Sequence, residues 1–469
     1  MMAGRSRRSI RRVEVLMNNS EVGFMNIESE RHSPIEHITF TYLDSWLAND
    51  TSFEISPELP LMRGEQRPTM GREIFGSFAD AAPDAWGQRL LHEKARLRAR
   101  ETGTPIPNNT EVSRLLMVND QTRQGALRFR ENGEFLSSWG ESADLRDVAE
   151  LAIEAQAYED TGVIDEKSRL LIGAGSSPGG AQPKAWIRDE DGTMLLAKFP
   201  KTSDRGNLQL WEMVAIQLQQ RAGIQVQPSK LMRLNAYSQI FLTKRFDRVG
   251  ESRIPYISAR TALQINTYDH PNYVKLTREI ARISAAPNLD ANEMFSRAAF
   301  GAMVNNIDDH MRNHGLLRHS RGWRLSPSFD VNPMRSGVSE TPLVPGGDVY
   351  DRNVLELLDH LDSFRLTRRE AVQRLRIINE AISHWAVEAL KFGAEVDEPD
   401  SMKRAFEGRN IDRVTDLRDE EPPRVIDLAK SDRTPPDNSL AMEERKWIDP
   451  HFRGEKRIPG HFRSKPDQS

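Results

Sequence analysis

The stretches Asp308-Asp309-His310-Met311-Arg312-Asn313 and Phe329-Asp330-Val331 decide the fold that this sequence predicts. Asn313 follows Asp308 by five positions, and Asp330 follows Asn313 by seventeen. Asp308 can take a proton from a hydroxyl group, whereas the Asn313 carbonyl and the Asp330 carboxylate are hard oxygen ligands that suit Mg²⁺. A catalytic loop followed by a short hairpin would bring all three to one metal-bound triphosphate. The spacing therefore predicts a site for phosphoryl transfer.

Protein kinases carry these three side chains in this order, with the first Asp as base and the other two as metal ligands. Three fixed residues also occur in ordinary polar loops, so Asp308 and Asn313 need support from the rest of the chain. Asp330, at a plausible hairpin distance, gives that support. His310 within the motif favours a structural role in ordering the loop over a role as base or zinc ligand.

Lys198 lies in the apolar stretch 195–199, where a buried lysine needs a partner. Glu212, fourteen residues later in a predicted helix, is the candidate for an ion pair, and ATP phosphates would be a second partner. The alternative is an edge-strand lysine in water and a solvated glutamate. The Asp308 motif downstream favours the kinase interpretation.

A loop rich in Gly, Ser and Pro spans 173–180 and is followed by Ala181-Gln182-Pro183-Lys184. Glycines let backbone N–H groups approach phosphate oxygens, and Lys184 adds positive charge. The sequence is not a Walker A motif, and such loops are often ordinary turns. Its position just before the Lys198 hairpin, where a kinase keeps its glycine-rich loop, favours phosphate binding.

Arg245-Phe246-Asp247-Arg248 follows a predicted strand between Glu212 and Asp308. A kinase places there the hinge whose backbone binds adenine. An ordinary strand end with ion-paired arginines is the competing interpretation. Five arginines of a C-terminal helix could contact DNA phosphates, although such a run is more often a solvated face: Arg365, Arg368, Arg369, Arg374 and Arg376.

Composition narrows the class of protein. The 469 residues suffice for two or three domains, and the net charge of −4 gives no global case for nucleic acid as a partner. The chain has no cysteine, which excludes disulfides, thiol catalysis and cysteine–metal sites. The arginine-rich N-terminus lacks the apolar segment of a signal peptide, and no apolar run reaches the roughly 18–20 residues of a membrane span. We expect a cytoplasmic protein that does not bind membranes.

Hydrophobic periodicity predicts an α+β protein with four segments. Residues 1–135 form a small α/β subdomain, and 136–250 form a nucleotide-binding lobe with the glycine-rich loop, the lysine strand and the hinge. Residues 251–411 form a helical lobe that carries the catalytic loop, and 412–469 a polar tail without stable structure.

Together these motifs resemble the HipA family of bacterial toxin kinases. Ser177-Pro-Gly-Gly-Ala-Gln-Pro-Lys184, the Arg245–Arg248 run, the Asp308 motif and Phe329-Asp330 recur there in this order. The N-terminal part also fits the family, through Tyr42–Leu47, Ile55–Leu61, Asp80–Gly87 and Gly125–Leu127. The resemblance covers residues 13–400.

The resemblance implies a bilobal, protein-kinase-like fold with an all-helical C-terminal lobe. It also implies a serine/threonine protein kinase that uses ATP and Mg²⁺, with Asp308 as catalytic base and Asn313 and Asp330 as metal ligands. It assigns Ser177 as the site of inhibitory autophosphorylation, with Ser176 as the alternative. It further implies a serine of an aminoacyl-tRNA synthetase as substrate, inhibited translation and dormancy, and a HipB-like helix-turn-helix antitoxin through which DNA is bound indirectly. The nucleotide contacts that it implies are Gly179, Gly180, Ala181, Gln182, Lys184, Lys198, Glu212, Lys244, Arg245, Phe246, His310, Asn313 and Asp330.

Two departures from the family pattern matter. Lys244 stands where a familiar member has Glu, although only backbone contacts are needed there. The wording of the 178–184 loop indicates a different branch from the best-known toxin, so target and antitoxin cannot simply be inherited. The alternative function is a catalytically weak scaffold that holds an antitoxin on operator DNA. Retention of the complete Lys198, Asp308, Asn313 and Asp330 set argues against it.

Overall fold

In the computed structural model the chain divides into two compact units, Met1–Leu417 and Arg418–Ser469. The structure describes residues 8–30, 35–137, 143–164, 168–175, 181–204, 206–235, 238–266, 269–395, 398–417, 446–448, 451–453, 456–458 and 461–463. No helix among these residues is long and apolar enough to cross a lipid bilayer.

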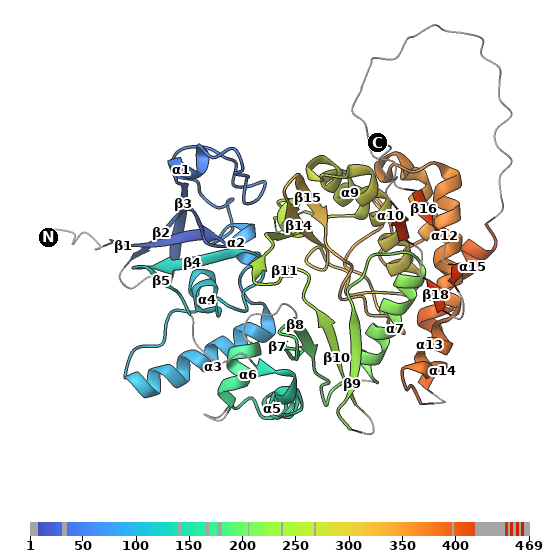
Figure 1. Cartoon of the computed structure of the whole chain (residues 1–469), viewed down its shortest axis with the longest axis horizontal. Helices are drawn as coiled ribbons and strands as arrows, with labels where there is room; N and C mark the ends of the chain where they lie inside the picture. The colour runs from blue at the N-terminus through green and yellow to red at the C-terminus, as the bar shows by residue number, and fades with distance from the viewer. Residues whose placement is uncertain are drawn as a thin grey trace, which may run out of the picture. The chain divides into compact units, whose positions relative to one another are not determined.

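A twisted antiparallel sheet in the order β3-β2-β1-β4-β5 begins the first unit (Figure 1). Its strands are β1 (Arg8–Met17), β2 (Ser20–Glu30), β3 (Glu36–Tyr42), β4 (Leu127–Glu131) and β5 (Glu134–Phe135). Val13, Val15 and Met17 alternate along β1 and are buried, as their period predicts. Asn132 and Gly133 both adopt positive φ between β4 and β5, which is the backbone of a type I′ hairpin turn.

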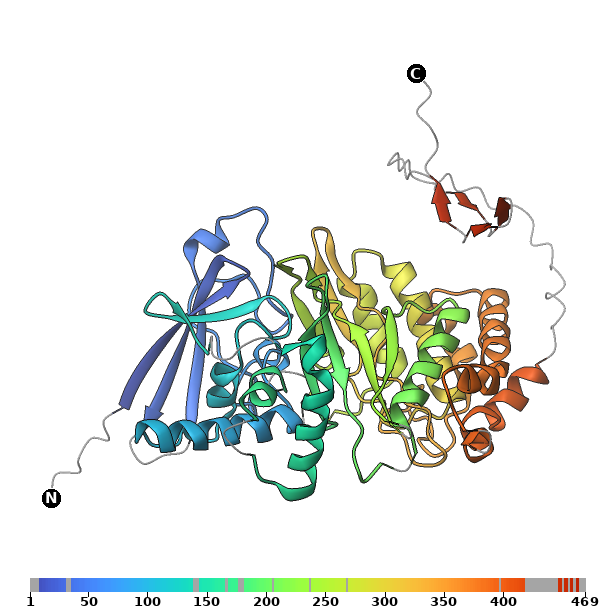
Figure 2. The same cartoon turned by 60° about the horizontal axis from the view of Figure 1, so that its bottom comes forward.

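Helices pack beside this sheet and lead into the next one (Figure 2). They are α1 (Asp44–Leu47), α2 (Gly76–Asp80), α3 (Ala85–Thr102), α4 (Glu111–Met117), α5 (Val148–Thr161) and α6 (Arg169–Gly175), with a 3-10 turn at Leu145–Asp147. Trp86 of α3 is fully buried, and its indole N–H donates to the Lys184 carbonyl at 2.9 Å. This bond fixes the start of α3 beside the sheet that carries Lys184.

The second five-stranded sheet has the order β6-β7-β8-β10-β9. Its strands are β6 (Ala143–Asp144), β7 (Lys184–Arg188), β8 (Met194–Lys198), β9 (Ser229–Arg233) and β10 (Gln239–Lys244). In the antiparallel register Lys198 pairs with Lys184 on one side and with Phe241 on the other. Helix α7 (Leu208–Arg221) packs against β10 and β9 and places Glu212 beneath the sheet.

The C-terminal lobe, residues 251–417, is mostly helical. It is built around the central helix α10 (Pro287–Met303), twelve of whose residues are buried. Its other helices are α8 (Ala259–Ala262), α9 (Tyr273–Ile283), α11 (Leu361–Phe364), α12 (Arg368–Ser383), α13 (Trp385–Lys391), α14 (Glu398–Phe406) and α15 (Arg409–Thr415), with a 3-10 helix at Val354–His360. Thr367 and Glu370 form the predicted capping box at the start of α12.

This lobe also carries a small sheet, β13 (Tyr256–Ser258), β14 (Gly315–His319) and β15 (Gly322–Leu325), preceded by the short pair β11 (Arg248–Val249) and β12 (Ser252–Arg253). The β14–β15 hairpin was expected from its sequence, whereas β13 was not. Because α10 ends at Met303 and β14 begins at Gly315, the Asp308 motif occupies the loop between them. The predicted mixture of helices and sheets is confirmed, but the prediction that this lobe is all-helical is wrong, because β13, β14 and β15 form a sheet within it.

The described residues of the second unit form four three-residue strands. Strand β16 (Lys446–Ile448) pairs with β19 (His461–Arg463), and β17 (His451–Arg453) pairs with β18 (Lys456–Ile458), both antiparallel. These strands lie in the part of the chain from 412 for which no stable structure was expected, and α15 also extends past that boundary to Thr415.

Candidate functional site

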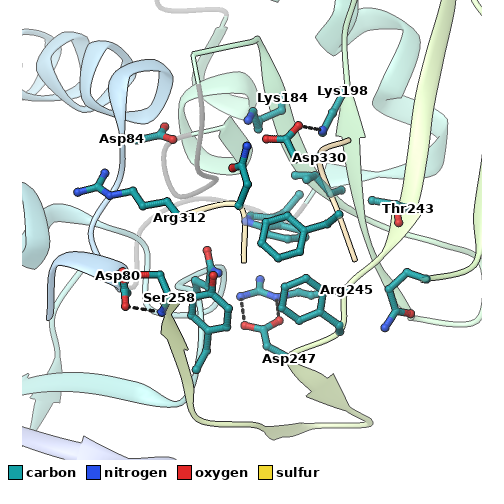
Figure 3. A pocket seen from close by; sticks show the side chains of 18 of the residues that line it. Asp80, Asp84, Lys184, Lys198, Thr243, Arg245, Asp247, Ser258, Arg312 and Asp330 are labelled. Atoms are coloured by element: carbon teal, nitrogen blue, oxygen red, sulfur yellow. Dashed lines mark hydrogen bonds and ion pairs between the residues drawn. The ribbon is translucent and has the colours of Figure 1, made fainter. Parts of the chain in front are cut away.

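A cavity of about 460 Å³ lies between the second sheet and the C-terminal lobe (Figure 3). This volume falls in the range of roughly 300–1,000 Å³ that holds small-molecule ligands. The sequence-predicted residues that line it are Ala181, Lys184, Lys198, Glu212, Lys244, Arg245, Phe246, His310, Asn313 and Asp330. The fold thus gathers ten predicted site residues, spread over 150 positions of sequence, around one space.

Lys198 is the electrostatic centre of the cavity. Its ammonium lies 2.7 Å from Glu212 Oε1 and 2.6 Å from Asp330 Oδ1, and its side chain is almost fully buried. Burial by itself would lower the pKa of Lys198, but Asp330 and Glu212 outweigh it and hold that pKa above its ordinary value. The predicted Lys198–Glu212 ion pair is therefore present, and Lys198 is a fixed positive charge.

Asp330 is held in an unusual backbone conformation. Its φ is +58°, a left-handed value that is uncommon outside glycine and is often found at functional sites. Oδ1 accepts from Lys198 and, at 3.3 Å, from Asn332 Nδ2. Despite burial, Lys198 and Lys184 keep the pKa of Asp330 well below its usual range, so the carboxylate is ionised. Oδ2 has no hydrogen bond to any described residue and remains available for a ligand.

The loop after α10 separates the roles of two neighbouring aspartates. The Asp308 side chain is 59% exposed, and its Oδ1 lies 3.7 Å from His310 Nε2. Partial burial, with the nearby negative charge of Asp330, raises the pKa of Asp308. Asn313 Nδ2 donates to the Asp308 carbonyl at 2.8 Å, which leaves the Asn313 amide oxygen free. Asp308 borders the cavity through this loop without lining it.

Asp309, in contrast, is buried and fully bonded. Tyr273 Oη donates to its carboxylate at 2.7 Å, His314 Nε2 lies 3.2 Å away, and Arg352 Nη2 donates at 2.5 Å. These contacts, Arg352 above all, overcome burial and hold the pKa of Asp309 well below its usual range. The network ties the catalytic loop to α9 and to the segment before the 3-10 helix at 354.

This network adds a histidine to the expected ones. His314, which is buried against Asp309, orders the loop. His310 lines the cavity, its Nε2 lies 3.7 Å from Asp308 Oδ1, and its Nδ1 is buried without a hydrogen-bond partner among the described residues. The sequence signal for the network was available in the doubled aspartate and in the histidine directly after Asn313, but neither suggested which residue would be buried.

The predicted hinge, Lys244 to Phe246, has backbone groups without hydrogen-bond partners among the described residues and lies next to a buried network of ion pairs. The Lys244 N–H donates to the Pro228 carbonyl at 3.0 Å and the Arg245 N–H to the Met194 carbonyl at 3.0 Å. Pro228 has no N–H to return a bond to the Lys244 carbonyl, and the Phe246 N–H has no partner among the described residues. One acceptor and one donor are therefore unused at the cavity edge.

Behind this edge, Asp247 accepts from Arg245, from Arg248 at 2.9 Å and from the Gly125 backbone N–H at 2.6 Å. Burial opposes ionisation, but the two arginines keep the pKa of Asp247 below its ordinary value. Arg245 also donates to the Arg123 carbonyl at 2.6 Å. The arginines of the hinge motif are thus structural and fasten the hinge to the segment before β4.

The phosphate-loop candidates are only partly described. Lys184 is buried, and burial lowers its pKa, while Asp330 counteracts this effect. Gln182 Nε2 donates to the Phe199 carbonyl at 3.3 Å and does not line the cavity. Gly179 and Gly180, and the predicted phosphosites Ser176 and Ser177, lie outside the described residues.

The N-terminal part adds two carboxylates, Asp80 and Asp84, for which the sequence motif 80–87 predicted no role in the site. Asp80 accepts from the Ser258 N–H and hydroxyl, both at 2.7 Å. Asp84 precedes α3 and lines the same cavity, and burial raises the pKa of Asp84 to about 7 against the opposing effect of Lys184 and Arg312. Only the packing of α2 and α3 beside the sheet brings these residues to the site.

Comparison with known families shows which family the chain resembles. Residues 13–131 match the HipA N-terminal domain and residues 176–387 match the HipA-like C-terminal domain. The chain belongs to the HipA family. This family has a kinase-like fold and comprises toxins of toxin–antitoxin systems. The described cavity of this HipA-family chain lies at the junction of the two matched domains, since Asp80 and Asp84 belong to the first and Lys198 and Asp330 to the second.

One solved structure supports the fold. HipA of Shewanella oneidensis MR-1, in a complex with HipB and operator DNA, is 17% identical, with a TM-score of 0.62 over 87% of this chain and 100% of that one. The Helicobacter pylori proinflammatory kinase CtkA is 14% identical, with a TM-score of 0.37 over 51% of this chain and 94% of that one. No curated protein matches the sequence significantly.

Proposed function

We propose that this HipA-family protein is an ATP- and Mg²⁺-dependent protein kinase that phosphorylates serine or threonine. The observation that carries the proposal is Lys198, held between Glu212 and Asp330 on the wall of the cavity. A lysine fixed by a helical carboxylate, beside a carboxylate suited to metal, is the arrangement that orients nucleotide phosphates in kinases. A scaffold without catalysis would have no need to bury these three charges together.

The adenine would lie at the hinge. The Lys244 carbonyl and the Phe246 N–H are unused there and match the donor and acceptor that the adenine edge offers. The Phe246 and Phe329 rings, with centroids 5.3 Å apart, supply an apolar surface at this end of the cavity. Because backbone groups make the polar contacts, the change to lysine at 244 should not prevent ATP binding.

The metal-binding proposal rests on the donor set. The free Asn313 amide oxygen and the free Asp330 Oδ2 are hard ligands, and Mg²⁺ commonly takes one or two protein oxygens with substrate phosphates and water. Among the described residues no group of three or more His, Asp or Glu forms a metal cage. When bound, Mg²⁺ would neutralise charge on the phosphates.

Asp308 would act on the acceptor. The serine hydroxyl oxygen forms a bond to the γ-phosphorus, the bond to the β–γ bridging oxygen breaks, and ADP leaves. The hydroxyl proton passes to an Asp308 carboxylate oxygen. Exposure of Asp308 suits this role because a protein substrate must approach it from solvent.

The finer proposals concern targets and regulation, and they rest on the family. We infer that the substrate is a serine of an aminoacyl-tRNA synthetase in the cytoplasm, so that phosphorylation inhibits translation and promotes dormancy. The relative from Shewanella is a complex with HipB and operator DNA, which supports a HipB-like antitoxin here, with DNA reached through it. Autophosphorylation of Ser177, or of Ser176, would place negative charge beside the ATP phosphates and inhibit the kinase.

The deciding experiment is incubation of purified protein with γ-labelled ATP and Mg²⁺, with phosphosite mapping. Label in the wild type, and none in Asp308→Gln or with EDTA, is the expected result. An Asp308→Gln protein that labels itself at the wild-type rate would show that the base is wrongly assigned. Absence of label from unphosphorylated wild type that binds ATP would favour the rival function, a HipB- and DNA-binding scaffold.

A further inference from the structure

Asp84 is unusual among the acidic residues of the cavity. Five line it, and four have partners in the described structure: Asp80 with Ser258, Glu212 and Asp330 with Lys198, and Asp247 with Arg245. Asp84 Oδ1 is buried and has no hydrogen-bond partner among the described residues. Because an unmet buried acceptor is costly, it indicates a partner that arrives with a ligand.

The local structure shows that this orientation is not imposed by the helix. Asp84 is the N-cap of α3, where an aspartate ordinarily accepts a hydrogen bond from the first turn. Its side chain makes no such bond, although the Asp84 carbonyl accepts from the Gln88 N–H at 2.7 Å. Figure 3 shows the carboxylate directed into the cavity, toward the side where Lys184 and Asp330 lie.

The charges around Asp84 identify the kind of partner. Lys184 and Arg312 are close enough to favour its ionised form, and Asp330 is close enough to disfavour it. Asp84 therefore lies at the end of the cavity proposed for phosphates and metal, and not at the hinge. Nucleotide phosphates alone would repel it. A hydrated cation bound at Asp330 would attract it, and Mg²⁺ keeps several water molecules that can donate hydrogen bonds.

We propose that Asp84, from the N-terminal domain, accepts hydrogen bonds from water on the Mg²⁺ of a bound metal–nucleotide complex. This inference rests on the proposed function, since it requires metal-bound ATP in the cavity. Asp84 is a positioning residue: it contacts the hydration shell, while Asn313 and Asp330 contact the ion. The N-terminal domain would thereby help determine affinity for the metal form of the nucleotide.

The test measures equilibrium binding of an ATP analogue with a nitrogen bridge between its β- and γ-phosphates, so that no transfer occurs. Mg²⁺ is titrated at fixed analogue for wild type, Asp84→Asn and Asp84→Ser. Loss of a hydration-shell partner should raise the Mg²⁺ concentration at half-saturation by about 10–100-fold. In EDTA at about pH 8, above the Asp84 pKa of about 7, both variants should bind the analogue at least as well as wild type, because a repulsive charge has been removed.

Asp84→Ser keeps an N-cap residue for α3 while removing the charge, so it covers the case in which Asp84→Asn folds poorly. Glu190→Gln, an exposed position on the β7–β8 turn, controls for the same change in net charge and should leave the Mg²⁺ midpoint unchanged. An unchanged midpoint in both Asp84 variants, or an equal change with and without metal, would overturn the inference alone. Wild-type protein that fails to bind the analogue with Mg²⁺ would overturn the proposed function instead.

Discussion

The Lys198 ammonium lies 2.6 Å from Asp330 Oδ1, across 132 residues of sequence, and joins the second sheet to the C-terminal lobe. The same ammonium contacts Glu212 of α7 at 2.7 Å. One cation therefore connects a strand, a helix and the segment after the β14–β15 hairpin.

Lys198→Met should abolish phosphoryl transfer and also destabilise the fold. Removal of the cation leaves two carboxylates close together without their partner, and breaking a buried ion pair in this way costs about 3–5 kcal/mol. Urea unfolding followed by circular dichroism measures the free energy of unfolding. Lys230→Met, which breaks an exposed pair with Asp189, should cost under about 1 kcal/mol. Equal stability of the two variants would contradict the buried arrangement.

Asp308→Asn should leave stability nearly unchanged, whereas Asp309→Asn should lower it. The exposed Asp308 should change the free energy of unfolding by no more than about 0.5 kcal/mol, while transfer falls by at least about 100-fold. Asp309→Asn should lower stability by about 3 kcal/mol, because Arg352 loses a buried partner. Thermal unfolding and labelling of both proteins check this. Loss of stability in Asp308→Asn, with none in Asp309→Asn, would reverse the assignment.

Acid should remove the contribution of Asp309 to stability. Its folded-state pKa is depressed below the unfolded value of about 3.9, so the stabilisation is complete above that value and is lost as pH falls toward the folded pKa. The free energy of unfolding of wild type should therefore decline below about pH 4, and more steeply than that of Asp309→Asn. Unfolding curves between pH 3 and pH 6 give the two slopes. Parallel slopes would show that Asp309 is not held ionised.

Asp247→Ala should loosen the hinge from the N-terminal domain. It removes the acceptor shared by Arg245, Arg248 and the Gly125 N–H, and leaves two largely buried guanidinium groups without their carboxylate partner. We expect a loss of about 3–5 kcal/mol in the free energy of unfolding, with weaker ATP binding.

Glu131→Gln is the matched control for this change. It removes an exposed partner of Arg11, and should cost under about 1 kcal/mol and leave ATP affinity unchanged. If Asp247→Ala unfolded at the wild-type urea concentration, the hinge network would be incidental to stability.

Much of the fold followed from local sequence pattern. Alternation along Val13–Met17, the Asn132-Gly133 turn and the Thr367–Glu370 capping box are determined within a few residues, so sequence alone predicts them. The Lys198–Glu212 pair belongs to the same class, because a strand and the helix directly after it leave little choice of geometry.

Which side chains of the loop after α10 are buried could not be predicted from local sequence pattern. Asp308 and Asp309 are adjacent and chemically identical, yet one is exposed and the other is enclosed by Tyr273, His314 and Arg352. Which of the two neighbours is buried depends on helix α9 and on the segment before the 3-10 helix, which lie 36 and 43 residues away in sequence. The pattern within the loop carries no information about that packing.

The sequence by itself determined the order and spacing of the lysine, asparagine and aspartates. Within a loop or a strand–helix unit, that spacing is enough to predict which of these side chains lie close together. Only the tertiary structure decided that Asp84 enters the same cavity as Lys198 and Asp330. That juxtaposition depends on α3, whose buried Trp86 bonds to the Lys184 carbonyl, and so on burial of apolar surface between segments about a hundred residues apart. Long-range burial is a property of the whole chain, and no short motif encodes it.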